Sequence, residues 1–379
     1  MPAFDRITID QIIEQVLDIT YSSQVDYEYM GDIYSVHHND IYITEYIDRF
    51  MEHYKVNQTA MESVTSIFVV ENVEISHVCH RMLNQEDIFQ MHIGKGERWD
   101  MKAKVSEYGD WRLVHQLNTG TVYFINSNTR TCIVLGSKES SLNEDVFHLM
   151  RSLMPRSSEA KGNSIFHAAG VRYQDRGIMI VGESGNGKTT TFIDFILQGA
   201  IPVSNDRIFI PSNTKVELAM FEWPSFINTS VGTLDKVKQL NHLLPDVHYE
   251  RFEDLWYSKV KLPIEPPEFK RIFNVEYLKS SVIDVIIFPR LRPEQNTCEL
   301  IRVDGYMASN LLRESCYSPD DPAYLNWHQY LNVSDSEVRS QSEDIIRRLT
   351  DTVPAFLLVG GADLSDGIQQ ISKMLDEGI

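Results

Sequence analysis

The sequence lacks any long hydrophobic run. Its longest apolar stretches, such as residues 282–289, have the length of a strand and fall well short of the roughly 20 residues that span a bilayer. The N-terminal segment MPAFDRITIDQIIEQ carries acidic residues where a secretory signal has a basic region followed by an apolar run. These absences predict a soluble, cytoplasmic protein with no membrane partner.

Cysteine and positive charge are also scarce. The four cysteines lie far apart and form no CxxC pair, so the sequence predicts neither a zinc site nor a disulfide framework. The 35 Lys and Arg residues are outnumbered by 54 Asp and Glu residues, and the net charge of −19 opposes nonspecific binding to nucleic acid. We therefore expect no nucleic-acid partner.

The chain is long enough for two domains, with 379 residues of which 42% are hydrophobic. Residues 63–137 are rich in β-branched and aromatic runs, two of which flank Asn126-Ser127-Asn128 as in a hairpin. A helix is predicted at 143–153, and the polar segment 155–164 reads as a connector. The sequence predicts an N-terminal α+β region at 1–155, rich in strands, and a second domain at 156–379.

The second domain has an α/β pattern. Two strands, a glycine-rich loop, a helix and the strand-like segment IPVSNDRIFIP follow one another from residue 164 to 211. Further strands are predicted at 280–290 and 354–361, and helices at 304–315, 334–352 and 363–377.

The glycine-rich loop carries the most specific motif. Residues 182–189, GESGNGKT, fit G-x-x-x-x-G-K-[ST] in full, between a predicted strand and a predicted helix. Such a loop aims backbone N–H groups at phosphate oxygens, and the helix start adds its positive end. We expect Lys188 to reach the β and γ phosphates of ATP and the Thr189 hydroxyl to bind Mg²⁺. The predicted nucleotide-binding residues are Gly182, Ser184, Gly185, Asn186, Gly187, Lys188, Thr189 and Thr190.

A carboxylate follows the loop sooner than in usual P-loop enzymes, where the second metal ligand lies well downstream. Asp206 interrupts an apolar strand-like segment, with Asn205 before it and Arg207 after it. A lone Asp is often part of a surface turn, but apolar runs on both sides favour a functional role. We predict that Asp206 lies on the strand after the helix and binds Mg²⁺ together with Thr189.

Residues 165–210, IFHAAGVRYQDRGIMIVGESGNGKTTTFIDFILQGAIPVSNDRIFI, resemble the P-loop core of the HPr kinase/phosphorylase superfamily. The likeness continues weakly through SSVIDVIIFPRLRPE and VPAFLLVGGADL. The first 140 residues are more similar to HPr-kinase-related proteins found beside peptide-modifying enzymes, including kinases of lasso-peptide precursors. The resemblance implies an α/β, HPr-kinase-like (PEP-carboxykinase-like) P-loop fold.

The resemblance also implies roles for single residues. His167 matches the histidine that precedes the loop and lies near the reacting phosphate, and Asp206 matches the second acid of a catalytic pair. Asn205 stands where the first acid is expected, and a neutral amide cannot act as a base. Either Asp206 is the base while Thr189, water and nucleotide hold the metal, or His167 is the base, or the protein binds nucleotide without efficient transfer.

Arg290, at the end of a predicted buried strand, matches a basic group near the phosphates and is predicted to neutralise transition-state charge. Lys261 and Arg292 are weaker candidates for the same role.

The predicted function is that of a Mg-ATP-dependent kinase acting on a hydroxyl, most simply a Ser of a peptide or small protein such as a natural-product precursor. The N-terminal region would select the acceptor. The alternatives are a kinase of a small-molecule hydroxyl (nucleoside, sugar or natural-product intermediate) and a non-catalytic nucleotide-binding regulator. Kinases of the resembled family often self-associate, although no coiled-coil heptad is visible here.

Overall fold

The computed structural model describes residues 8–57, 64–72, 74, 79, 89–94, 101–137, 140–212, 217–245, 252–292, 294–295, 297–361 and 363–378. The chain is a mixed α/β protein, as predicted, and divides into two compact units. The first unit holds residues 1–160 and 320–334, and the second holds residues 161–319 and 335–379. None of the helices in the described ranges combines the length and the apolar character that a membrane crossing requires.

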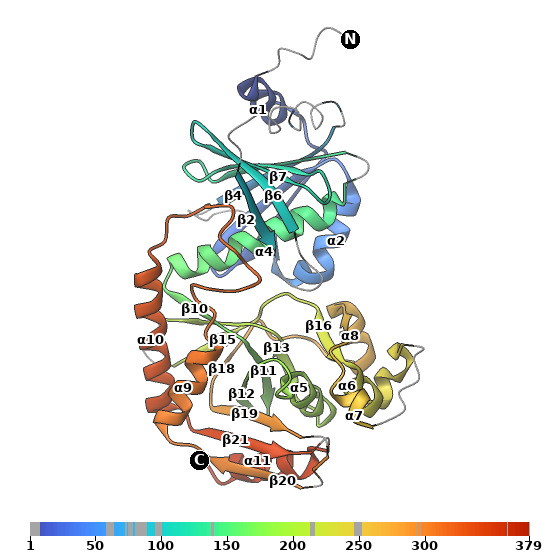
Figure 1. Ribbon diagram of the computed structural model, residues 1–379, viewed down its shortest axis with the longest axis vertical. Coiled ribbons are helices and arrows are strands. Elements are labelled where there is room, and N and C mark those ends of the chain that lie inside the picture. Colours follow the sequence, from blue (N-terminus) through green and yellow to red (C-terminus); the bar gives the residue numbers. More distant parts are fainter. Residues whose placement is uncertain are drawn as a thin grey trace. The chain divides into compact units, whose positions relative to one another are not determined.

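A nine-stranded sheet forms most of the first unit (Figure 1). Its strands are β1 (Ser23–Tyr29), β2 (Asp32–His38), β3 (Lys55–Val56), β4 (Val64–Glu71), β5 (Phe89–Gly94), β6 (Met101–Tyr108), β7 (Trp111–Gln116), β8 (Val122–Asn126) and β9 (Thr131–Gly136), and the helices are α1 (Ile9–Leu17), α2 (Ile41–Met51) and α4 (Leu142–Ala160). The strand order is β3-β1-β2-β4-β9-β8-β7-β6-β5. β4 runs parallel to β2 and β9, whereas β8 and β9 form the antiparallel hairpin predicted around residues 126–128.

Residues 320–334 return to the first unit and contribute to its core. Trp327 and Tyr330 are fully buried there. The indole Nε1 of Trp327 donates to Ser152 Oγ at 3.2 Å, and the Tyr330 hydroxyl lies 2.6 Å from Thr65 Oγ1. The first unit is therefore discontinuous in sequence.

The boundary between the units differs from the predicted one. The prediction of a polar connector at residues 155–164 is wrong, because α4 continues through Pro155 and ends at Ala160. Arg156, Ser157, Ser158 and Glu159 are buried, and Arg156 pairs with Glu159 at 2.7 Å. Polar side chains can lie inside a fold where they pair with one another, as Arg156 and Glu159 do, so polar composition alone did not identify a connector.

The described residues of the second unit form three sheets. Its strands are β10 (Asn163–Phe166), β11 (Ala168–Tyr173), β12 (Arg176–Val181), β13 (Ile201–Ser204), β14 (Ile208–Pro211), β15 (Ala219–Phe221), β16 (Ile227–Ser230), β17 (Lys261–Ile264), β18 (Ser280–Val282), β19 (Val285–Leu291), β20 (Cys298–Arg302) and β21 (Ala355–Gly360). The helices are α5 (Lys188–Leu197), α6 (Val231–Lys236), α7 (Phe252–Trp256), α8 (Pro266–Phe273), α9 (Gly305–Ser315), α10 (Asp335–Thr352) and α11 (Ser365–Asp376). The sheet orders are β13-β11-β12-β19-β21-β20, β10-β14-β15-β18 and β16-β17.

Helices cover both faces of the six-stranded sheet. Along the central strand β12, Ile178 and Ile180 enter one apolar cluster with side chains of α5 and α11. Met179 and Val181 point to the other face, into a cluster with side chains of α9 and α10. Because β12, β19 and β21 run parallel and are covered on both faces, their sequences are nearly continuous apolar runs.

The chain passes between the six-stranded and four-stranded sheets at two neighbouring places. β10 and β14 pair in the four-stranded sheet, with Phe166 opposite Ile208, whereas β11 and β13 pair in the six-stranded sheet. His167 joins the first two strands in sequence, and residues 205–207 join the other two. The segment IPVSNDRIFIP, predicted as one strand, is therefore two strands of different sheets, and its polar residues form the corner between them.

Candidate functional site

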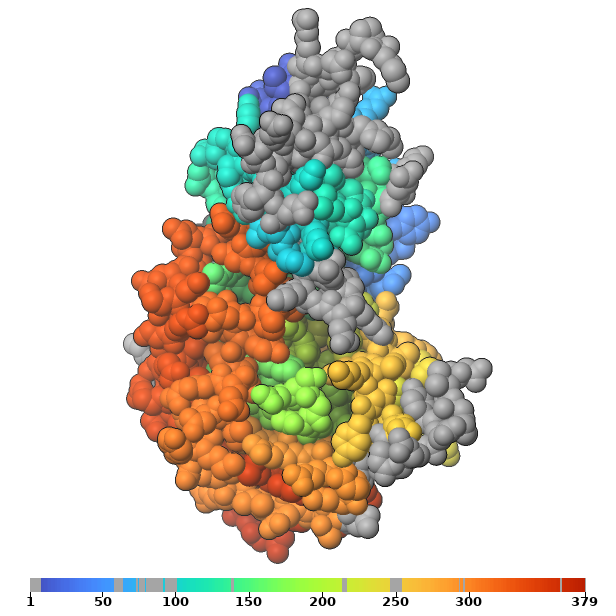
Figure 2. Space-filling view, in the orientation of Figure 1, coloured from blue at the N-terminus to red at the C-terminus, as the bar shows by residue number. Residues whose placement is uncertain are grey.

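The glycine-rich loop occupies residues 182–187, between the end of β12 and the start of α5, so the strand, loop and helix expected from the motif are all present. Gly185 and Gly187 have φ values of 95° and 98°, in the region that glycine adopts without strain. A Cβ on Gly187 would also lie 2.4 Å from side-chain carbons of Leu291. In Figure 2 the light green atoms of this part of the chain reach the surface between orange and yellow atoms of the same unit.

The Lys188 side chain is buried against the loop. It is only 7% exposed, and Nζ donates to the carbonyl oxygens of Gly182 at 2.6 Å and Glu183 at 3.3 Å. Burial lowers the pKa of Lys188 to about 8, opposed by the negative charge of Asp206 and reinforced by Lys261 among the neighbouring cations. The ammonium is thus held on carbonyl oxygens of the loop itself.

The two threonines at the start of α5 have different surroundings. Thr189, the predicted Mg²⁺ ligand, is half-buried in the first turn. Thr190 is buried, and its Oγ1 lies 2.7 Å from Thr233 Oγ1 on α6. The predicted nucleotide contact of Thr190 stays a prediction, and the orientation of its hydroxyl does not favour it.

The corner between the sheets brings His167 and Asp206 together. His167 Nε2 lies 3.7 Å from Asp206 Oδ1. Asp206 was predicted to lie on a strand, but it lies in the bend between β13 and β14. The pairing of β10 with β14 explains the proximity, because it fixes both crossings of the chain at one place.

Two further residues of this corner were not predicted as site residues. The guanidinium of Arg207 forms an ion pair with Asp206 Oδ2 and packs on the ring of Tyr317, 5.1 Å from its centroid. The same ring stacks on His167, with centroids 5.0 Å apart and an interplanar angle of 14°. Arg207 adjoins Asp206 in sequence, but no sequence signal connects Tyr317 with either residue.

Asn205, which replaces the expected first acid, has a structural contact. It is 6% exposed, and its Nδ2 donates to the carbonyl oxygen of Phe226 at 3.1 Å. An ionised carboxylate has no proton to donate at this position. The amide therefore suits the local backbone.

The predicted basic residues lie at different distances from the loop. Arg290 is exposed near the end of β19, whose next residue, Leu291, donates its backbone N–H to the Asn186 carbonyl oxygen at 3.2 Å. Lys261, at the start of β17, donates to Ser184 Oγ at 3.0 Å. Of the basic candidates, Lys261 thus makes a direct side-chain contact with the loop.

Within the described ranges, no group of three or more His, Cys, Asp and Glu side chains could hold a metal ion. A single carboxylate with a hydroxyl still suits Mg²⁺ in a nucleotide site, because Mg²⁺ often binds through one or two carboxylates and takes its other ligands from phosphates and water. Asp206 could supply the carboxylate and Thr189 the hydroxyl.

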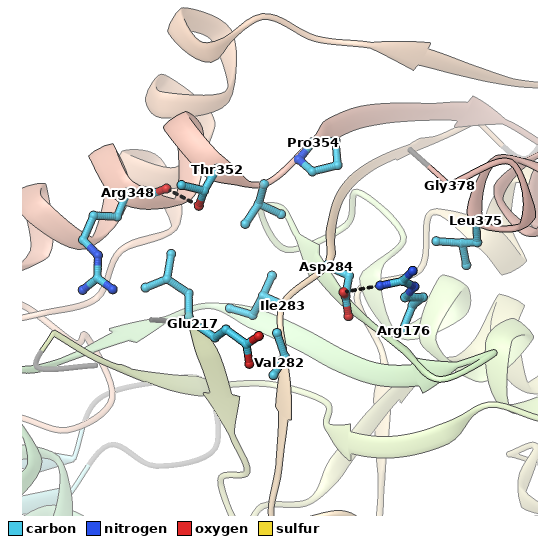
Figure 3. Close-up of a pocket in the computed structure, with 12 residues that line it drawn as sticks. Arg176, Glu217, Val282, Ile283, Asp284, Arg348, Thr352, Pro354, Leu375 and Gly378 are labelled. Atoms are coloured by element: carbon cyan, nitrogen blue, oxygen red, sulfur yellow. Dashed lines mark hydrogen bonds and ion pairs between the residues drawn. The ribbon is translucent and has the colours of Figure 1, made fainter. Parts of the chain in front are cut away.

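A cavity of about 510 Å³ lies elsewhere in the second unit (Figure 3). Its charged lining residues include Glu217, Arg348 and the pair Arg176–Asp284, whose side chains are 3.2 Å apart. Arg176 begins β12 and Pro354 precedes β21, so the cavity is at the N-terminal ends of the parallel strands. Ligands of open α/β sheets bind at the carboxyl ends, and we therefore place the candidate site at the loop.

No known family profile and no curated protein matches the chain. Among solved structures, the chain is similar to the Hpr(Ser) kinase/phosphatase from Coxiella burnetii, with 16% sequence identity and a TM-score of 0.22. The match covers 35% of this chain and 62% of that protein, which is less than two thirds of its length. Membership in the HPr kinase superfamily stays a prediction from the motifs.

Proposed function

We propose that the protein is a Mg-ATP-dependent kinase that transfers the γ-phosphoryl group to a hydroxyl, most simply a Ser of a peptide or small protein such as a natural-product precursor. One observation carries the proposal: the loop lysine and the His167–Asp206 pair belong to one electrostatic site. Asp206 acts on the pKa of Lys188 and lies 3.7 Å from His167. A phosphate-binding cation and a base are among the groups that this transfer uses.

Each residue then has a defined task. Lys188 and the loop N–H groups bind the phosphates, and Arg207 adds positive charge beside them. Thr189 would hold Mg²⁺ together with water and the nucleotide, and the ion would neutralise charge on the phosphates. The acceptor oxygen forms a bond to the γ-phosphorus as the bond to the bridging oxygen of ADP breaks, and the hydroxyl proton passes to Asp206.

A second candidate is a nucleotide-binding regulator that transfers nothing. Two observations favour it: Asp206 is ion-paired with Arg207, and its neighbour Asn205 is a neutral amide bound to backbone. A neutral amide cannot act as a base, so the corner holds one carboxylate where the resemblance implied two.

Incubation with γ-labelled ATP and Mg²⁺ tests the proposal. The acceptors are Ser-containing peptides and small proteins in one set, and nucleosides and sugars in another. We expect label on a peptide or protein and a loss of roughly 10²-fold or more in Asp206→Asn. The matched control is Asp175→Asn, in the turn between β11 and β12, where the carboxylate is 90% exposed.

The other outcomes separate the alternatives. Label only on a small molecule favours a small-molecule kinase. ATP binding without transfer to either set favours the regulator. Equal transfer by Asp206→Asn and the wild type contradicts the proposed role of Asp206.

A further inference from the structure

The segment that follows α9 is fixed to the corner of the site by backbone hydrogen bonds. Tyr317 donates its N–H to the Ile165 carbonyl oxygen at 2.8 Å, and His167 donates its N–H to the Ser315 carbonyl oxygen at 2.7 Å. Phe166 and Cys316 form a β-bridge between these bonds. The backbone thus sets the position of the Tyr317 ring relative to His167.

The Tyr317 ring contacts both partners of Asp206. It stacks on His167 and carries the Arg207 guanidinium, with centroid distances of 5.0 and 5.1 Å. The two carboxylate oxygens of Asp206 have separate neighbours: Oδ2 pairs with Arg207, and Oδ1 faces His167 at 3.7 Å. The ring thus contacts a neighbour of each carboxylate oxygen.

We propose that Tyr317 is a positioning residue, which holds His167 and Arg207 beside the two carboxylate oxygens of Asp206. This inference rests on the proposed kinase function. The ring acts through stacking on the imidazole and through the attraction between its face and the guanidinium. Neither interaction needs the phenol hydroxyl, so phenylalanine should replace tyrosine at this position.

The expected kinetic effect is specific to turnover. Replacing the ring in Tyr317→Leu should lower kcat roughly tenfold to a hundredfold, as for a reacting group displaced by about 1 Å. KM for ATP should stay within about twofold, because Lys188 and the loop bind the phosphates. Tyr317→Phe should keep the kcat of the wild type.

A double-mutant cycle with Asp206→Asn tests whether Tyr317 acts through that carboxylate. If it does, Tyr317→Leu should have no further effect on kcat once Asp206 is replaced. Equal fold losses in the two backgrounds would overturn the inference, as would an equal loss in Tyr317→Phe and Tyr317→Leu.

Crystal structures of the full chain with Tyr317→Leu and Tyr317→Phe give a readout that does not depend on activity. We expect Arg207 to leave Asp206 Oδ2 in the leucine variant and to stay in the phenylalanine variant. An unchanged Asp206 site in the leucine variant would overturn the inference. If the leucine variant does not fold, Tyr317→Met takes its place. Absence of transfer by the wild type would instead contradict the proposed function, while these structures would still decide the role of Tyr317.

Discussion

Raising the pH from 7.5 to 9 should weaken ATP binding about eightfold, because Lys188 loses its proton in this range. Burial of the side chain lowers the pKa of Lys188 to about 8 in the free protein. Roughly three quarters of the molecules carry the ammonium at pH 7.5 and roughly one tenth at pH 9, and the dissociation constant rises as the competent fraction falls. Bound phosphates favour the charged form and raise the pKa again, so binding above pH 8 takes up a proton.

Calorimetric titration at several pH values measures this effect. Titrations in two buffers of different ionisation enthalpy should report uptake of about 0.9 proton per ATP at pH 9. Lys188→Arg is the matched variant, because a guanidinium stays charged throughout and should give a flat profile. A flat profile in the wild type, or the same slope in Lys188→Arg, would refute the reasoning.

Three further predictions concern stability. Trp327→Ala should lower the free energy of unfolding by about 3–5 kcal/mol, since the indole is fully buried. The control Asn326→Ala, at an exposed neighbour, should change it by less than about 0.5 kcal/mol. Similar melting temperatures for both variants in near-UV circular dichroism would contradict this prediction. Asn205→Asp should lower the free energy of unfolding, measured in urea, by roughly 1–3 kcal/mol, because a carboxylate would face the Phe226 carbonyl oxygen. A variant more stable than the wild type would be evidence against that contact. Burial raises the pKa of Asp145 from 3.8 to about 6. The stabilising contribution of Asp145 is therefore present below pH 3.8 and is lost as the pH rises through 6, by on the order of 3 kcal/mol. In urea unfolding, the free energy of unfolding should depend less on pH in Asp145→Asn than in the wild type, and the same pH dependence in both would contradict this prediction.

The local parts of the fold could be predicted from the sequence. The strand, loop and helix around residues 176–197 are determined by the spacing of apolar residues and glycines within short stretches of the chain. The corner could not be predicted in the same way, because whether residues 201–211 form one strand or two depends on which distant strands they pair with. For the same reason the return of residues 320–334 to the first unit left no sign in the sequence.

The candidate site was predictable where a motif exists. The loop pattern made Lys188 a candidate, and the family resemblance made His167 and Asp206 candidates. Tyr317 could not be found, because its place beside the corner depends on the path of the chain after α9. The replacement of an acid by Asn205 raised a question about activity, and the amide's bond to backbone gives a structural reason for it.

Titration of the wild type and Lys188→Ala with MgATP is the most direct test of the central claim, that the loop after β12 binds nucleotide phosphates. We predict that the wild type binds and that Lys188→Ala binds roughly 10-fold to 150-fold more weakly, as for the loss of a charged hydrogen bond. Lys373→Ala, which removes an exposed lysine on α11, should bind like the wild type. Equal affinities of Lys188→Ala and the wild type, or no binding by the wild type, would contradict the account.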